Sequence, residues 1–114
     1  MRQNYYEEAE KYGLIYARQK GDMESSIYVY SEIGSMYNTG FHIERGSEFL
    51  QRSLALSRPY IENGTASLWL QELYANVQLY LAEHYFSYND YNAAATCLKD
   101  AAPTMQQLLQ PTAP

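Results

Sequence analysis

The chain reads YSEIGSMYNTGFHIERGSEFL at residues 30–50 and QLYLAEHYFSYNDYNAAATCL at residues 78–98, and both stretches follow one spaced pattern. In each stretch a small residue is followed by another twelve positions later, Gly34 by Gly46 and Ala82 by Ala94. Large residues flank them at helical spacing: Tyr30, Ile33, Tyr37 and Leu50 in the first copy, and Leu81, Tyr85 and Leu98 in the second. Small side chains recur where two helix backbones approach closely. The pattern therefore predicts helix-turn-helix hairpins that stack on one another.

Hydrophobic spacing and turn residues predict about five helices and no strands. The expected helices are residues 5–19, 23–38, 43–56, 67–87 and 91–110. In the first of them Ala9, Tyr12 and Tyr16 recur at three and four residues and mark the expected apolar side. The fold class is thus all-α, with one helical domain over residues 1–110 and a disordered tail at residues 111–114.

Two prolines are expected to interrupt helices. Pro59 disfavours helical backbone in Arg58 before it, so the third helix should stop there. The Asn-Gly pair at residues 63–64 then marks the turn of a linker over residues 61–65. Pro103 removes a backbone donor, so the last helix should kink or stop near Ala102.

Composition limits the function classes. With 13 acidic and 8 basic residues the net charge is −5, which leaves no basic footprint for nucleic acid or an anionic membrane surface. A neutral or basic partner is expected. No apolar run approaches the ~20 residues that cross a bilayer, and the N-terminus lacks a signal-peptide pattern, so a cytoplasmic location is expected.

Neither a metal site nor a catalytic site is predicted. The single cysteine, Cys97, excludes an internal disulfide and is expected to be a buried, inert thiol. His42 and His84 have no partner at metal-ligand spacing. No phosphate loop or nucleophile arrangement is present, so we expect neither cofactor nor enzyme activity.

The paired pattern resembles the tetratricopeptide repeat family. Its signature is matched by Tyr30, Ile33, Gly34, Tyr37, Gly46 and Leu50, and again by Leu81, Ala82, Tyr85, Ala94 and Leu98. Gln78 departs from the aromatic residue expected at the start of the second copy. The resemblance covers about residues 5–105. It implies a short right-handed α-solenoid of antiparallel helix pairs, and a chain that could be one segment of a larger bacterial regulator or scaffold.

The resemblance also implies a concave groove lined by the second and fourth helices, which binds a protein or peptide. Candidate groove residues lie at three- and four-residue steps: Tyr28, Ser31, Ser35 and Asn38, then Asn76, Leu79, Glu83 and Phe86. A merely solvated face is the alternative interpretation of these rows. The faces carry no Lys or Arg, which argues against the carboxylate-clamp members of the family.

Three functions follow as hypotheses. The first is a non-catalytic protein or peptide interaction module used as a scaffold. The second is a peptide-sensing segment of a bacterial signalling or transcription regulator, in which a bound peptide changes the superhelical pitch. The third is a self-associating helical bundle, because so few repeats leave apolar end faces uncovered.

Overall fold

The computed structural model describes residues 2–109 and, for the side chains, residues 5–109. These residues form five helices and no strand, which confirms the all-α fold class. The helices are α1 (Arg2–Lys20), α2 (Met23–Thr39), α3 (Ile43–Glu62), α4 (Leu68–Ser87) and α5 (Tyr91–Leu109). The tail predicted at residues 111–114 lies outside the described residues.

Local turn chemistry places most helix ends where the sequence predicts them. The carboxylate of Asp22 caps α2 by accepting a 3.2 Å hydrogen bond from the backbone N–H of Ser25. The hydroxyl of Ser67 caps α4 in the same way, accepting from the N–H of Leu70 at 3.2 Å. Between α1 and α2, Gly21 adopts φ +71°, a backbone conformation that glycine reaches without strain. These ends are local in origin.

The predicted stop before Pro59 is wrong. Helix α3 continues through Pro59 to Glu62, and the linker begins at Asn63 rather than at Ile61. The extra turn places Ile61 against the core cluster shared with α4. Apolar packing of that turn offsets the hydrogen bond that Pro59 cannot donate.

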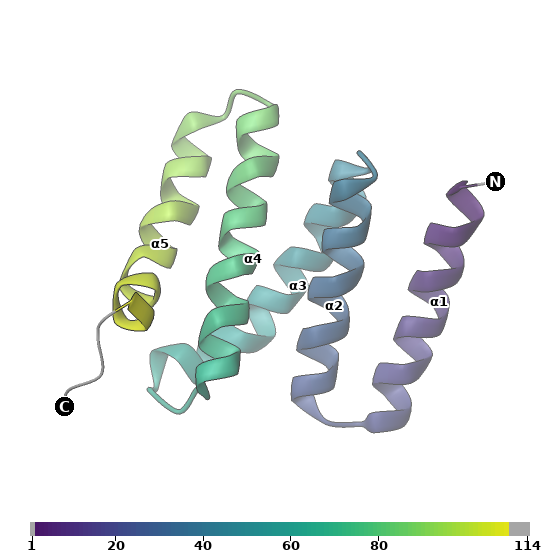
Figure 1. The fold of residues 1–114 in the computed structure, drawn as a ribbon, viewed down its shortest axis with the longest axis horizontal. Coiled ribbons are helices and arrows are strands. Elements are labelled where there is room, and N and C mark those ends of the chain that lie inside the picture. The colour runs from purple at the N-terminus through teal and green to yellow at the C-terminus, as the bar shows by residue number, and fades with distance from the viewer. Residues whose placement is uncertain (1, 110–114) are drawn as a thin grey trace.

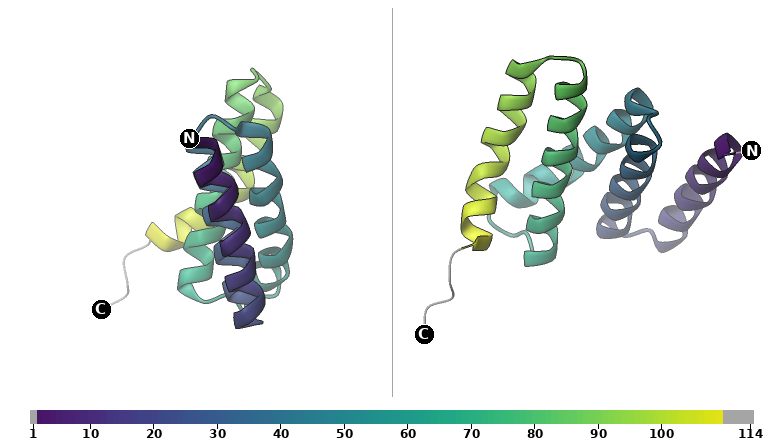
Figure 2. Two further views of the ribbon diagram at one scale, coloured as in Figure 1. Left: turned by 90° about the vertical axis from the view of Figure 1, so that its right-hand side faces the viewer. Right: turned by 45° about the horizontal axis from the view of Figure 1, so that its top comes forward.

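Of the two outcomes predicted near Ala102, a kink or a stop, the stop does not occur, because α5 remains helical through Pro103 to Leu109. The predicted kink is present. The last turns of α5 are seen end-on in Figure 1 and run sideways in the left view of Figure 2, away from the rest of the helix. Proline thus bends this helix without ending it.

The helices pack mainly against their neighbours in the chain. The backbones of α1 and α2, α2 and α3, α3 and α4, and α4 and α5 approach closely. One further pair, α2 and α4, lies side by side, while α3 crosses behind them (Figure 1). Helices α1 and α5 lie at opposite edges of a body measuring 51 × 38 × 23 Å (Figure 1). In the described part of the chain α1 and α5 do not touch, so the helices do not close into a bundle.

The two predicted small-residue pairs lie inside the hairpins. A Cβ atom added to Gly34 would come 2.9 Å from the carbonyl oxygen of Gly46, and one added to Gly46 would come 2.8 Å from that of Gly34. In the second hairpin Ala82 and Ala94 are 2% and 0% exposed. Close backbone approach therefore joins α2 to α3, and the buried alanines lie at the equivalent positions of α4 and α5.

Two apolar clusters form the core. The first joins α1, α2 and α3: Ala17, Val29, Ile33, Tyr37 and Phe49, with Tyr30 packed against it. The second joins α3, α4 and α5: Leu50, Leu54, Tyr74, Val77, Leu81, Ala82, Ala94 and Cys97, with Tyr85 packed against it. Leu98, predicted as a packing residue, is instead 38% exposed. Its counterpart Leu50 is covered by α4, whereas no described helix follows α5 to cover Leu98.

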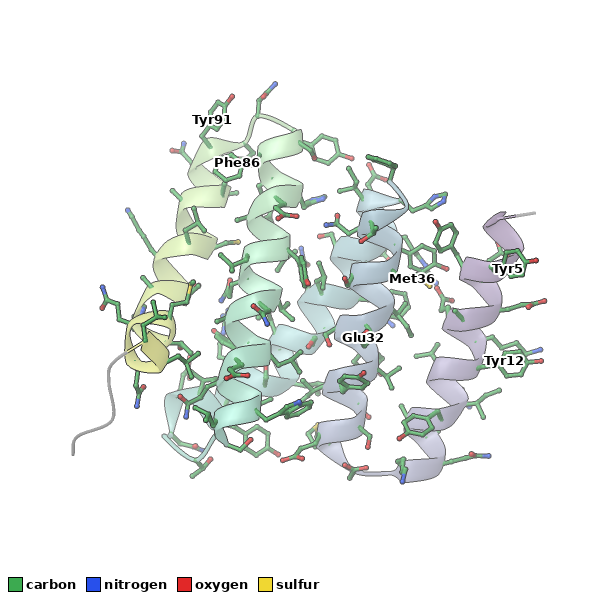
Figure 3. All side chains as sticks on the ribbon, in the orientation of Figure 1. Tyr5, Tyr12, Glu32, Met36, Phe86 and Tyr91 are labelled. Atoms are coloured by element: carbon green, nitrogen blue, oxygen red, sulfur yellow. The ribbon has the colours of Figure 1, made fainter. Side chains whose placement is uncertain are left out.

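The apolar side predicted for the first helix is wrong. Tyr12 and Tyr16 are 62% and 48% exposed, and Ala9 is exposed as well. Helix α1 instead packs on α2 through Leu14 and Ala17. In Figure 3 Tyr5 and Tyr12 point outward from α1, away from the other helices.

Candidate binding face

Helices α2 and α4 share an exposed surface on the side opposite α3. We call it the front face; its residues recur at three- and four-residue steps and are all exposed: Tyr28, Glu32, Glu72, Asn76, Tyr80 and Glu83. Glu32 lies on α2 beside the gap to α1, where Met36 is half-buried (Figure 3). The front face therefore consists of exposed rows, which we call the stripe, on two helices that pack side by side.

The front face is acidic. Neither α2 nor α4 contains a lysine or arginine, and their four glutamates are all exposed: Glu24, Glu32, Glu72 and Glu83. The stripe also exposes the rings of Tyr28 and Tyr80, which are 44% and 36% exposed. Carboxylates next to partly exposed aromatic rings suit a ligand that carries positive charge.

The predicted groove residues divide between this face and other surroundings. On α4, Asn76 and Glu83 lie on the front face, and Leu79 is half-buried beside it. Phe86 is 47% exposed, but its ring pairs with that of Tyr91 on α5 at 6.1 Å (Figure 3). Phe86 therefore belongs to the α4–α5 hairpin and not to the stripe.

On α2 the predicted row is partly wrong. Ser31 is 3% exposed and donates its hydroxyl to the carbonyl oxygen of Tyr28 at 2.7 Å, so no ligand can reach it. Ser35 and Asn38 are half-buried, and the backbone of Asn38 lies against Gly46 of α3. Tertiary packing is the cause, because α2 is contacted by α1, α3 and α4. Of the four residues only Tyr28 is exposed.

The sequence interpretation missed Glu32, Glu72 and Tyr80. Glu32 and Tyr80 each lie two positions before a small packing residue, Gly34 or Ala82. Two residues turn a helix by about 200°, so each side chain points away from the hairpin partner that the small residue touches. A position two residues before each small packing residue was therefore the sequence signal that could have identified the exposed side chains of Glu32 and Tyr80.

A second group of polar residues lies where α1, α2 and α3 meet. Glu7, Glu10, Tyr37, His42 and Arg45 line a cavity of about 550 Å³. The Nε and Nη2 atoms of Arg45 donate to the two carboxylate oxygens of Glu10 at 3.1 and 3.0 Å, and the hydroxyl of Tyr37 donates to the same carboxylate at 3.0 Å. Burial and the Glu10 carboxylate raise the pKa of Tyr37, and the hydrogen bond to Glu10 raises that of Arg45. Because the Glu10 carboxylate already accepts hydrogen bonds from Arg45 and Tyr37, we interpret this cluster as structural: it holds α1 against α3.

The remaining candidates are isolated. Within the described residues no group of three or more His, Cys, Asp or Glu side chains could hold a metal ion. The rings of His84 and Tyr88 meet edge to face at 5.2 Å, and burial lowers the pKa of His84. Cys97 is buried, which raises the pKa of its thiol.

None of the helices in residues 2–109 combines the length and the apolar character that a bilayer crossing requires. No family model, no curated protein and no solved structure matches the chain.

Proposed function

We propose that the chain is a non-catalytic interaction module, a short tetratricopeptide-like right-handed stack that binds a basic protein or peptide segment on its front face. The observation that carries the proposal is the charge of this face. It presents exposed glutamates and tyrosines on two adjacent helices that contain no lysine or arginine. Complementary charge speeds the encounter of such partners and sets their register.

The architecture supports the same function. Successive hairpins joined by close backbone contacts leave the front of α2 and α4 uncovered, as repeat scaffolds do. A peptide-sensing role would be this binding event coupled to a change in the pitch of the stack, within a larger regulator.

The proposal is tested with an array of peptides of varied charge and a charge-reversed protein. Glu32→Lys with Glu83→Lys should abolish binding of the best basic peptides, with an unchanged melting temperature. The matched control, Glu8→Lys with Glu62→Lys, changes the net charge equally at exposed sites outside the stripe and should bind nearly as well as the parent. Equal loss in both variants would indicate a nonspecific charge effect, and no loss in either would remove the front face as the site.

A second candidate function is self-association, and a separate observation favours it. The outer side of α1 exposes Tyr5, Tyr12 and Ile15, which are 70%, 62% and 36% exposed, at the edge of the molecule (Figure 3). An uncovered apolar helix side at the end of a stack can pair with another copy.

A further inference from the structure

A small aromatic pocket lies where the start of α2 meets α1 and α4. It has a volume of about 300 Å³ and is lined by Tyr16, Asp22, Glu24, Ser25, Tyr28 and Trp69. These residues come from three helices and the α1–α2 turn, so the pocket exists only in the folded stack. The ring centroids of Tyr28 and Trp69 are 6.1 Å apart.

The rings of this pocket remain accessible although they lie together. Tyr16, Tyr28 and Trp69 are 48%, 44% and 42% exposed. Their faces carry partial negative charge and attract cations, tryptophan most strongly. One ring already does so, since the Nζ atom of Lys20 lies 5.9 Å from the centroid of Tyr16.

The two carboxylates of the pocket reinforce this preference. Asp22 accepts the capping hydrogen bond from Ser25, which lowers the pKa of its carboxyl and keeps it ionised at neutral pH. Glu24 is exposed one turn below Tyr28. Both carboxylates border aromatic rings. They outnumber the one ammonium group beside the pocket, that of Lys20, so a cation would be attracted.

The dimensions and the shape of the groups favour arginine. The volume is at the lower end for ligand sites, which suits one long side chain better than a whole small molecule. A guanidinium is planar, stacks on aromatic rings and donates to carboxylates through a fork of N–H groups. An ammonium offers only a point charge.

We propose that this pocket binds an arginine side chain of the basic segment that occupies the front face. The aromatic rings take the plane of the guanidinium, and Asp22 and Glu24 accept its N–H groups. The assignment rests on the proposed function and adds the residue that anchors the partner. A segment entering along the stripe would place its arginine at the start of α2 and its remaining basic residues beside Glu32, Glu72 and Glu83.

The test uses the single tryptophan of the chain, Trp69, as its reporter. A capped peptide with one central arginine among glycines and serines is titrated while tryptophan emission is followed. We expect a saturable change in emission. The same peptide with citrulline, which keeps the shape and removes the charge, should bind at least tenfold more weakly.

Variants locate the binding. Asp22→Asn with Glu24→Gln removes both charges while asparagine still caps α2, and should weaken the arginine peptide at least fivefold with an unchanged melting temperature. Tyr28→Leu should weaken it as well. Glu8→Gln with Glu62→Gln, the matched change at exposed sites outside both the pocket and the front face, should alter the affinity less than twofold.

Three outcomes would overturn the assignment. The first is that the citrulline peptide binds as tightly as the arginine peptide. The second is that the affinity is unchanged in the Asp22→Asn, Glu24→Gln protein. The third is that choline binds as tightly as the arginine peptide, which would indicate a pocket for ammonium ligands. If the pocket variants have no effect while charge reversal of the front face still abolishes binding of longer basic peptides, only the arginine pocket fails. If the pocket variants act and the front-face reversal does not, the stripe fails as the wider site.

Discussion

Gly46 of α3 lies so close to the backbone of α2 that a side chain at this position would clash with it. A Cβ atom at this position would lie 2.8 Å from the carbonyl oxygen of Gly34 and 3.0 Å from the backbone nitrogen of Asn38. These backbone atoms can move only if α2 moves as a whole. At Gly13, by contrast, the nearest atoms are side-chain carbons of Ile33 and Val29, at 3.3 and 3.4 Å.

Alanine substitution should separate these two glycines. Gly46→Ala should lower the free energy of unfolding by about 1–3 kcal/mol, because the clash outweighs the gain in helix propensity. Gly13→Ala should leave it unchanged or raise it by up to about 1 kcal/mol, since the Ile33 side chain can shift. Urea unfolding measures both. Equal effects of the two substitutions would show that the close approach in the α2–α3 hairpin is not needed for stability.

His84 makes stability depend on pH. Burial lowers its pKa, partly opposed by Glu44 of α3, and its Nδ1 atom has no hydrogen-bond partner. The folded state therefore disfavours the protonated imidazole relative to the unfolded chain, whose histidine titrates near 6.5. The resulting loss in the free energy of unfolding is absent at pH values above the pKa of the unfolded chain's histidine, and it grows as the pH falls below that pKa.

The prediction is that the free energy of unfolding decreases between pH 7.5 and pH 5.5, and that His84→Gln reduces this decrease. Denaturant unfolding at the two pH values provides the measurement. His42→Gln is the control, and it should leave the decrease essentially as large as in the parent. A parent-like decrease in the His84 variant would contradict the argument.

At the scale of helices, local chemistry was readable in the sequence and tertiary packing was not. The expected starts of the second and fourth helices, residues 23 and 67, agree with α2 and α4 to within one residue. Asp22 and Ser67 cap these helices, and a capping hydrogen bond depends on only a few adjacent residues. The path of α3 through Pro59 depends on the contact of Ile61 with the core shared with α4, which no local rule contains.

The face of a helix was harder to predict than its ends. In α1 the tyrosines at Tyr12 and Tyr16 mimic an apolar side, yet Leu14 and Ala17 are the residues that pack. Tyrosine is ambiguous here, since its ring suits both a core and an exposed surface. Ser31 was misplaced because the side of α2 that is covered depends on how α1, α3 and α4 all pack against it.

Helix α1 depends on the bond between Glu10 and Arg45. Its backbone closely approaches only that of α2, and this bidentate pair adds a polar link to α3 beside the shared apolar cluster. Arg45→Met and Glu10→Gln should each reduce hydrogen-exchange protection in α1 and leave α4 and α5 unchanged.

A double-mutant cycle should give a coupling energy of about 1 kcal/mol, near the upper end for an exposed pair because the geometry is bidentate. The control is Glu48→Gln, which removes the other carboxylate bound by Arg45, one turn away on the same helix. It should affect α1 little. Loss of protection in all five helices at once would mean that α1 does not unfold separately.

At the scale of the molecule, α1 lies at one edge and has an uncovered outer side (Figure 1). We expect a dimer at micromolar concentration that forms through the outer side of α1, measured by light scattering over a dilution series. Tyr12→Lys should make the protein monomeric. Tyr91→Lys is matched, since Tyr91 is also 62% exposed but lies near the other edge (Figure 3), and should leave the dimer intact. A parent protein that is monomeric throughout would refute the self-association hypothesis.

The buried sulfur atom of Cys97 offers a kinetic probe of the second hairpin. It is the only thiol of the chain and packs in the cluster between α3, α4 and α5, where its raised pKa suppresses the reactive thiolate. An alkylating reagent can reach it only when α5 detaches from α4. The alkylation rate therefore counts transient detachment events of the carboxyl-terminal hairpin without any engineered label, and ligands that tighten the stack would slow it.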